Sequence, residues 1–204
     1  MTELLAPIFQ FDPNTPFGSS GKPLSQYEFK LMDDNGRRVE GNLQPGELWV
    51  KGNAFFKGYL NDLEETRKML TEDGWFKTGD MFCKDEQNYY YFVERKRLLI
   101  RHYGAKISPL QMEEIIKRHP SVADAVVVGL PAPECLELPV AAILRRNGDK
   151  ISPQEIFDLL INNLDGKLQN GGLFFIDSVP ITPSGKVHRA KVKEMAVTAE
   201  KLIF

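Results

Sequence analysis

Residues 89–111 read YYYFVERKRLLIRHYGAKISPLQ, and the structure that the sequence predicts changes along this stretch. It opens on the aromatic run Tyr89–Val93, which is typical of a β-strand because such side chains fit a pleated surface. Apolar segments on either side of Gly104 predict a small hairpin. The stretch ends on Ser108–Gln111, where serine can cap a helix, proline fits its first position and glutamine completes a capping box. A β-rich part is therefore predicted before this stretch and an α+β part after it.

Upstream, residues 1–93 contain short strand candidates separated by turn residues. Gln26–Leu31 alternates polar and apolar positions and is predicted to be a strand. The Asn-Gly pair within Asp33–Gly36 predicts a turn, because this pair readily adopts positive φ. A further strand is expected over Gly46–Val50 and a short helix over residues 61–70.

Downstream, helices alternate with strands. A second serine–proline helix start occurs at Ser152–Glu155, and it is followed by an apolar stripe that is expected to end at Gly166. Strands are predicted over Ala123–Leu130, Val140–Leu144 and Leu173–Ile176, a polar loop over Thr182–Gly185, and a last helix from about Arg189. The predicted fold class is α+β.

Composition narrows the possible functions. The 204 residues carry 26 Lys and Arg against 28 Asp and Glu, so a net charge of -2 gives no general attraction to nucleic acids or anionic membranes. Cys83 and Cys135 lie far apart, which argues against a disulfide framework or a zinc site. No apolar run approaches the roughly 18 residues of a membrane span, and no signal peptide or targeting signal is recognisable. We expect a cytoplasmic or peroxisomal protein.

Four segments are candidates for chemistry: Met1–Glu3, Gly74–Asp80, Glu94–Ile107 and Pro183–Lys186. Thr78-Gly79-Asp80 is predicted to be a tight turn whose carboxylate either binds a diol or caps the next segment. Arg95–Arg101 is either a nucleic-acid patch or a solvated strand edge. Pro183–Lys186 fails the P-loop pattern because Pro180 stands where glycine is needed, so its lysine either reaches an anionic group or is solvated.

The order and spacing of these segments resemble those of adenylate-forming enzymes, which include acyl-CoA synthetases, 4-coumarate ligases, firefly-type luciferases and peptide-synthetase adenylation domains. The segments that carry the resemblance are Gly46–Gly52 with Gly58-Tyr59, Asp73–Asp80, Glu94–Arg101 with Gly104 and Ile107, and Val179-Pro180 with Thr182–Lys186. The resemblance implies that residues 1–96 are a distal β-rich remnant of a large AMP-binding domain. It also implies that residues 97–204 are a C-terminal α+β lid, with a hinge near Arg97.

The resemblance implies an acid–thiol ligase that joins a carboxylic acid to ATP, releases pyrophosphate and transfers the acyl group to coenzyme A. By similarity, Asp80 accepts hydrogen bonds from the ribose hydroxyls, and Arg95 contacts ribose or phosphate. Thr2 lies near the α-phosphate, and Glu3 helps to hold Mg²⁺, which prefers carboxylate oxygen. ATP or AMP, Mg²⁺ and coenzyme A are the implied cofactors, and a small-molecule carboxylic acid is the implied substrate.

The resemblance also assigns residues in the lid. Lys186 is the implied catalytic lysine, which donates to the substrate carboxylate and the α-phosphate. Arg101 faces the second half-reaction, and Gly104 lets the backbone approach the thiol tunnel. Arg97 takes the hinge position, where the family usually has Asp or Lys, and Glu94 replaces a more usual Asp.

The family's phosphate loop and acyl pocket are not found in these residues, since Ser19–Lys22 is too short to be that loop. An N-terminally truncated chain, inactive by itself because nothing positions ATP and acid, is the expectation. A non-catalytic module that regulates a full-length relative and a luciferase-like monooxygenase relative are the alternatives. A nucleic-acid binder using residues 95–106 is a third class. The acid, fatty or aromatic, is not named by the sequence.

Overall fold

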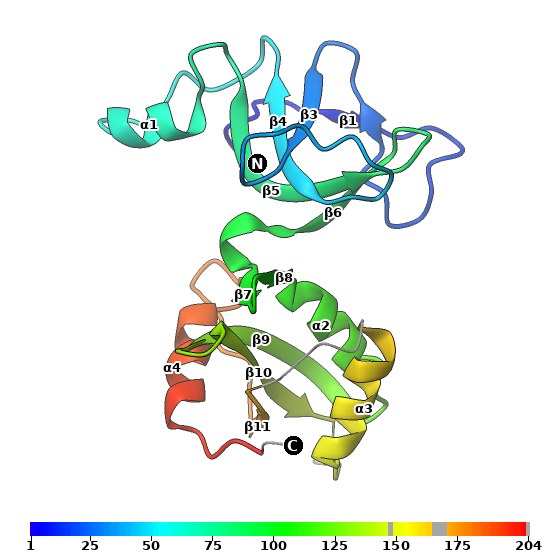
Figure 1. Ribbon diagram of the computed structural model, residues 1–204, viewed down its shortest axis with the longest axis vertical. Helices are drawn as coiled ribbons and strands as arrows, with labels where there is room; N and C mark the ends of the chain where they lie inside the picture. The colour runs from blue at the N-terminus through cyan, green and yellow to red at the C-terminus, as the bar shows by residue number, and fades with distance from the viewer. Residues whose placement is uncertain (147–148, 165–170, 203–204) are drawn as a thin grey trace. The chain divides into compact units, whose positions relative to one another are not determined.

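The computed structural model describes residues 1–146, 149–164 and 171–202, and it divides into two compact units, Met1–Arg97 and Leu98–Phe204. Figure 1 shows sheets and helices in the chain, so the predicted α+β class is confirmed. The predicted domains were 1–96 and 97–204, and the structure divides one residue later, after Arg97. The 3₁₀ turn η1 (Lys96–Leu98) spans this division.

The first unit is built on a four-stranded antiparallel sheet in the order β3-β4-β5-β6. Its strands are β3 (Glu28–Met32), β4 (Gly46–Lys51), β5 (Phe76–Lys84) and β6 (Tyr90–Arg95). Two short strands, β1 (Phe9–Gln10) and β2 (Lys22–Pro23), pair separately. The predicted turn after β3 is present, with the Gly36 amide donating to the Asp33 carbonyl at 3.2 Å. In this sheet each strand is hydrogen-bonded to the strand that precedes or follows it in sequence.

Alternation along β4 places the core of this unit. Leu48 and Val50 are buried, and the intervening Trp49 lies on the opposite face, as the two-residue period of a strand requires. Leu31 and Phe76 of the neighbouring strands pack in the same core. The short helix α1 (Leu63–Met69) buries none of its residues, so the sheet supplies most of the core.

The Thr78–Asp80 segment is not the tight turn that was predicted. It lies inside β5, where Lys77 pairs with Trp49 and Met81 pairs with Glu47. Thr78, Gly79 and Asp80 therefore stand opposite Leu48 as a β-bulge, and Gly79 adopts a φ of +68°. We call these three residues the Thr78–Asp80 bulge. A turn was predicted because glycine between polar residues is a turn signal, whereas pairing with β4 keeps the chain in the sheet.

The second unit has a five-stranded mixed sheet with helices on both faces. Its strands are β7 (Ile100–His102), β8 (Ala105–Ile107), β9 (Val122–Ala132), β10 (Leu136–Arg145) and β11 (Leu173–Ile176). β10 is central, with β9 antiparallel on one side and β11 parallel on the other. Figure 1 shows α2 (Pro109–Ile116) and α3 (Pro153–Asn163) over one face and α4 (Arg189–Thr198) over the other.

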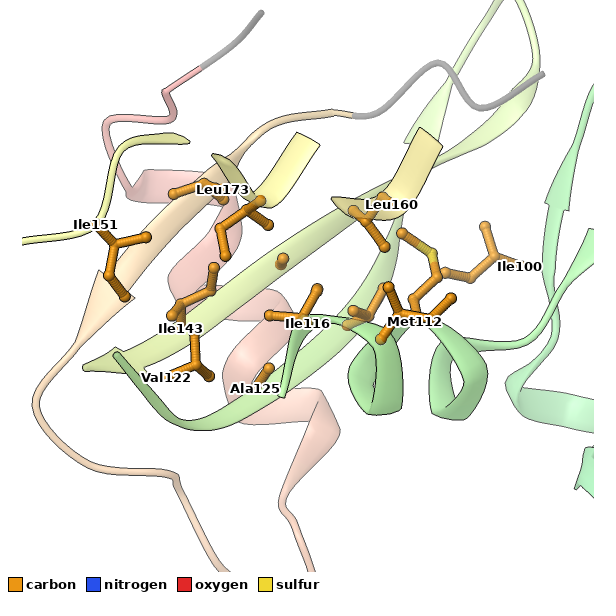
Figure 2. Close-up of a cluster of buried hydrophobic side chains, with 13 residues drawn as sticks. Ile100, Met112, Ile116, Val122, Ala125, Ile143, Ile151, Leu160 and Leu173 are labelled. Carbon is orange, nitrogen blue, oxygen red and sulfur yellow. The ribbon is translucent and has the colours of Figure 1, made fainter. Parts of the chain in front are cut away.

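Both faces of this sheet are apolar, which explains why helices cover both. Along β10, Ala141 and Ile143 contact the α2–α3 layer, and Val140 and Ala142 contact the α4 layer. Figure 2 shows Ile143 among the side chains of the first layer, with Met112, Ile116 and Leu160 contributed by the helices.

The predicted helix starts are confirmed. Ser108 caps α2 by accepting from the Gln111 amide at 3.2 Å, and the Ser152 amide donates to Glu155 at 2.8 Å at the start of α3. Gly166, the expected end of that helix, lies outside the described residues. In the three described ranges, no helix is both long and apolar enough to cross a membrane.

Candidate active site

The first element of the site is the ion pair between Asp80 and Arg95. The two residues are opposite one another in the β5–β6 ladder, so their side chains leave the same face of the sheet. The Nε atom of Arg95 lies 2.8 Å from Oδ1 of Asp80. Oδ1 is buried and has no aligned hydrogen bond, so the contact is electrostatic. The structure thus brings together two residues that the family resemblance assigns to one nucleotide.

Asp80 also lines an open pocket of about 650 Å³. The remaining walls are mostly apolar: Met1, residues 4–9, Ser20, Leu48, Thr78, Phe82 and Phe92. Burial raises the pKa of the Asp80 carboxyl, and the positive charge of Arg95 offsets only part of that effect. A pocket with apolar walls and one half-buried carboxylate is suited to an apolar ring that carries hydrogen-bond donors.

The Thr78–Asp80 bulge is held in place by side chains. The hydroxyl of Thr78 donates to the Leu48 carbonyl at 2.7 Å, and the amide of Asp80 donates back to that hydroxyl at 3.1 Å. The Gly79 amide donates to Oε1 of Glu47 at 3.3 Å. Buried Glu47 also accepts from Lys96 Nζ at 2.7 Å through its other oxygen, Oε2.

Lys96 therefore forms an ion pair with a buried acid. A second carboxylate, Asp34, lies 3.5 Å from the same ammonium. Burial works to lower the pKa of Lys96, but the hydrogen bond and the charge of Glu47, together with Asp34, outweigh it and raise that pKa. Lys96 is consequently held as a cation at the start of η1.

Glu3 is oriented by a tyrosine. The Tyr59 hydroxyl donates to Oε1 of Glu3 at 2.9 Å, and the Phe56 amide donates to the Glu3 carbonyl at 2.9 Å. Burial and the Glu3 carboxylate together raise the pKa of Tyr59 to about 12, so the phenol stays a donor. Thr2 is exposed in the turn that precedes Glu3.

This arrangement fits Mg²⁺ only in part. Mg²⁺ is usually bound by one or two carboxylates together with phosphate oxygens and water, and Glu3 supplies one such carboxylate. Across the described ranges, no three His, Cys, Asp or Glu side chains gather as a metal site. The ion would therefore depend on a nucleotide's phosphates for its remaining ligands.

Lys186 lies in an exposed loop of the second unit. The Thr182 amide donates to the Lys186 carbonyl at 2.7 Å, and the Lys186 amide donates to the Thr182 hydroxyl at 3.2 Å. Gly185 adopts a φ of +78°, which a glycine permits at little cost. Within the described part of the chain the Lys186 ammonium makes no salt bridge, so a fixed backbone presents an accessible cation.

A buried ion pair holds the segment that follows this loop. Arg189, the first residue of α4, donates from Nη2 to Oε2 of Glu113 at 3.0 Å and from Nη1 to the Val127 carbonyl at 2.9 Å. Glu113, on α2, also accepts from the Val127 amide at 2.8 Å. One carboxylate thus ties α2, β9 and the start of α4 together, three residues after Lys186.

Arg101 and Gly104, the residues that the resemblance assigns to the second half-reaction, both lie in the β7–β8 hairpin. Arg101 is exposed on β7, and its amide donates to Oε2 of Glu137 at 3.0 Å. Gly104 occupies the β7–β8 turn with a φ of +78°, and a Cβ added there would meet no heavy atom within 4 Å. The glycine is therefore required by backbone conformation. Among the described residues, no salt bridge or hydrogen bond joins Arg101 to Lys186.

Arg97 is the last residue of the first unit and is exposed in η1. Its charge contributes to lowering the pKa of Asp80, though by less than that of Arg95. Lys96, directly before it, is tied to Glu47, whereas Leu98 belongs to the second unit.

Three features of the site were missed by the sequence interpretation: the Glu47–Lys96 pair, the Glu3–Tyr59 hydrogen bond and the Glu113–Arg189 pair. Glu113 did carry a signal, because it is a charged residue at a helix position where the neighbouring pattern predicts burial, whereas alternation along β4 places Glu47 on the face opposite the core. A buried carboxylate requires a partner, but its partner lies 49 or 76 residues away along the chain and cannot be selected from spacing.

Comparisons with known proteins agree with both units. Residues 1–60 match the family model described as AMP-binding enzyme, and residues 111–186 match the AMP-binding enzyme C-terminal domain. Luciferin 4-monooxygenase of Photinus pyralis is 34% identical over 185 residues, which is 90% of this chain and 34% of that protein. 4-Coumarate-CoA ligase 1 of Narcissus pseudonarcissus is 36% identical over 177 residues, which is 86% of this chain and 32% of that protein.

The solved structures that resemble this chain include a CoA synthetase and an amide bond synthetase. The o-succinylbenzoate CoA synthetase of Bacillus subtilis, in complex with its acyl-adenylate intermediate, superposes on 100% of this chain and 41% of its own. Its TM-score is 0.85 at 29% sequence identity. An amide bond synthetase of Marinactinospora thermotolerans covers 87% of this chain and 36% of its own at 30% identity, with a TM-score of 0.77. The chain spans about a third of the length of the curated relatives it matches.

Proposed function

Because the chain belongs to the adenylate-forming enzyme superfamily, we propose that its two units serve the ATP-dependent activation of a carboxylic acid and its transfer to coenzyme A. The observation that carries this proposal is the position of Asp80, which is paired with Arg95 at 2.8 Å and lines a pocket of about 650 Å³. In this proposal the pocket takes the nucleoside, and the Asp80 carboxylate accepts hydrogen bonds from its ribose hydroxyls.

Lys186 has the second role. As the carboxylate attacks the α-phosphorus, negative charge builds on the phosphoryl oxygens, and a cation placed there stabilises the transition state. Its exposed ammonium on a hydrogen-bonded loop suits this role. Glu3 would help to hold Mg²⁺ beside the phosphates, with Thr2 near the α-phosphate. Mg²⁺, when bound, would neutralise phosphate charge.

Arg101 and Gly104 are proposed to serve the thiol step, in which coenzyme A displaces AMP. Arg97 is the proposed hinge between the units, and residues 1–96 and 97–204 are the proposed distal part of an AMP-binding domain and its lid. Transfer to a thiol is favoured by the names of the ligase relatives, whereas the luciferin 4-monooxygenases point to another fate of the adenylate. The shared step is adenylation.

A polypeptide limited to these 204 residues is proposed not to turn over, since the relatives are about three times as long. This is tested by pyrophosphate release with ATP, coenzyme A and a panel of fatty and aromatic acids. Turnover that Lys186→Ala abolishes would contradict it. The compartment is proposed to be the cytoplasm or the peroxisome, and one relative, from Arabidopsis thaliana, is named a peroxisomal CoA ligase.

The nucleoside site is tested by AMP binding to the chain, measured by calorimetry. Asp80→Asn should weaken binding at least tenfold, because hydrogen bonds to charged groups are worth about 1.5–3 kcal/mol. The matched control is Glu72→Gln, which neutralises an exposed acid of the same unit. Equal affinities for the two variants would refute the assignment.

The role of Lys186 is tested in a chimera. Residues 1–204 replace the superposable part of the Bacillus subtilis synthetase, which matches the whole chain, and ATP–pyrophosphate exchange is measured with o-succinylbenzoate. Lys186→Ala should slow exchange about 10²- to 10³-fold, as loss of one charge-stabilising donor does elsewhere. Lys150→Ala, which removes another exposed lysine of the second unit, serves as the control. Equal rates for both variants would exclude the proposed role.

A further inference from the structure

Glu47 is a buried carboxylate that the proposed chemistry leaves without a role. Its side chain is 9% exposed, and it lies on β4 opposite Met81, directly beside the Thr78–Asp80 bulge. Burying an ionised carboxylate is unfavourable unless its oxygens are paired. Both oxygens of Glu47 are paired, and with different parts of the unit.

The two partners of Glu47 belong to the two functional segments of the first unit. Oε1 accepts from the Gly79 amide at 3.3 Å, inside the bulge that presents Asp80 to the pocket. Oε2 accepts from Lys96 Nζ at 2.7 Å, at the start of η1. One rigid carboxylate therefore joins the nucleotide-facing bulge to the residue that precedes Arg97.

This pair also fixes where the chain is able to pivot. Lys96 is held on the first unit by Glu47 and, at 3.5 Å, by Asp34, and the units divide after Arg97. A hinge is formed by the few residues that absorb a change in φ and ψ. A residue whose ammonium is bound by two carboxylates of the same unit is poorly suited to absorb such a change. The proposed hinge is consequently placed at Arg97 and Leu98, directly after the tethered Lys96.

We propose that Glu47 is a positioning residue that couples nucleotide binding at the Thr78–Asp80 bulge to the stiffness of the hinge segment, with Lys96 as its partner. This inference rests on the proposed function for the identity of the ligand. The coupling itself is a property of the first unit and is measurable without a nucleotide. Ordering of the bulge by a bound ribose strengthens the Glu47 contacts, and these contacts hold Lys96.

The test is hydrogen–deuterium exchange of the full chain, followed in peptides that cover residues 77–81 and 95–99. Glu47→Gln should speed exchange about tenfold in both segments, the effect of losing one charge-assisted hydrogen bond. Lys96→Met should also speed exchange at 77–81, although among the described residues the salt bridges of Lys96 are with Glu47 and Asp34. The double variant should exceed Glu47→Gln by little because the two share one interaction. Glu40→Gln, at an exposed pair with Arg38, is the matched control.

AMP affinity gives the second readout. Glu47→Gln should weaken AMP binding about tenfold, and the Glu40→Gln control should bind as the wild type does. Exchange that rises in only one segment for Glu47→Gln, or Lys96→Met without effect at 77–81, overturns the coupling. If Glu47→Gln does not fold, Lys96→Met alone decides, since Lys96 is 36% exposed. Absence of AMP binding in the wild type counts against the proposed function, while the exchange data still judge the coupling.

Discussion

Replacing Glu113 by alanine should destabilise the second unit strongly, because it leaves buried polar groups without their partner. The carboxylate is 6% exposed and accepts from Arg189 and from the Val127 amide, and the Arg189 side chain is itself 23% exposed. Breaking a buried ion pair by removing one partner costs about 3–5 kcal/mol. Arg189 keeps the Val127 carbonyl and reaches some water, so the lower end, about 3 kcal/mol, is expected.

The measurement is urea unfolding followed by two signals. Far-UV circular dichroism reports both units, whereas fluorescence reports only the first, because both tryptophans, Trp49 and Trp75, lie there. With a urea m-value of about 1.5 kcal/mol/M, a loss of about 3 kcal/mol lowers the midpoint by about 2 M. The shift should appear in the dichroism transition and leave the fluorescence transition in place.

Two further variants show whether the lower urea midpoint of Glu113→Ala comes from the loss of the buried ion pair. Glu114→Ala removes the exposed carboxylate next to Glu113 on α2 and should leave the midpoint unchanged. Glu113→Gln keeps an acceptor for the Val127 amide but loses the charge, so it should fall between alanine and wild type. A shift below about 0.5 M for Glu113→Ala, or an equal shift for Glu114→Ala, would refute the reasoning. Arg189 follows Lys186 by three residues, so loosening the start of α4 should also loosen the loop that carries the proposed catalytic lysine.

Three further predictions concern the β7–β8 turn at Gly104, the Ser108 cap of α2 and the carboxyl group of Asp80. Gly104→Ala should cost about 1–2 kcal/mol in thermal unfolding because its φ is +78°, whereas Gly104→Asn should cost less; equal melting temperatures for wild type and Gly104→Ala would contradict this. Ser108→Ala should cost about 1 kcal/mol in the same assay by removing the cap of α2. Burial raises the pKa of Asp80 above 3.8, so its contribution to stability is complete below that pH and is lost as the pH rises through the folded pKa. Fluorescence-detected urea unfolding should therefore show Asp80→Asn gaining on the wild type as the pH rises from about 4 to 7, and a constant difference would oppose that view.

The elements of the second unit were largely predictable because their signals are local. Ser108 and Ser152, each followed by proline, marked two helix starts that the structure confirms. The strands β9 and β10 are longer than the predicted Ala123–Leu130 and Val140–Leu144, and each continues through a proline, Pro131 or Pro139, that lies outside the predicted range. Pro131 is tolerated because β9 is an edge strand that pairs only with β10 in the described sheet. Pro139 lies in β10 between Leu136, which pairs with β7, and Ala141, where pairing with β11 begins.

The sequence names candidate residues for the site, and it does not predict the contacts that those residues make. Motif order selected Asp80, Arg95 and Lys186, but the fold decides which groups surround them. Glu47 and Lys96 are 49 residues apart in sequence and meet only because β4 and the end of β6 lie in one sheet. No periodicity within either segment contains that information.

The pairing of Asp80 with Arg95 shows how such a contact is decided. From the β5–β6 turn, the ladder runs Lys84 with Tyr90, Cys83 with Tyr91 and Phe82 with Phe92. An unbroken register would next bring Asp80 opposite Glu94, and like charges directly opposite one another are destabilising. An irregularity between Met81 and Phe82 shifts the register by one residue, so Asp80 meets Arg95, and Glu94 accepts from the Arg95 amide at 2.8 Å. Of the two registers, the bulged one joins opposite charges, and the proposed nucleotide site depends on that choice.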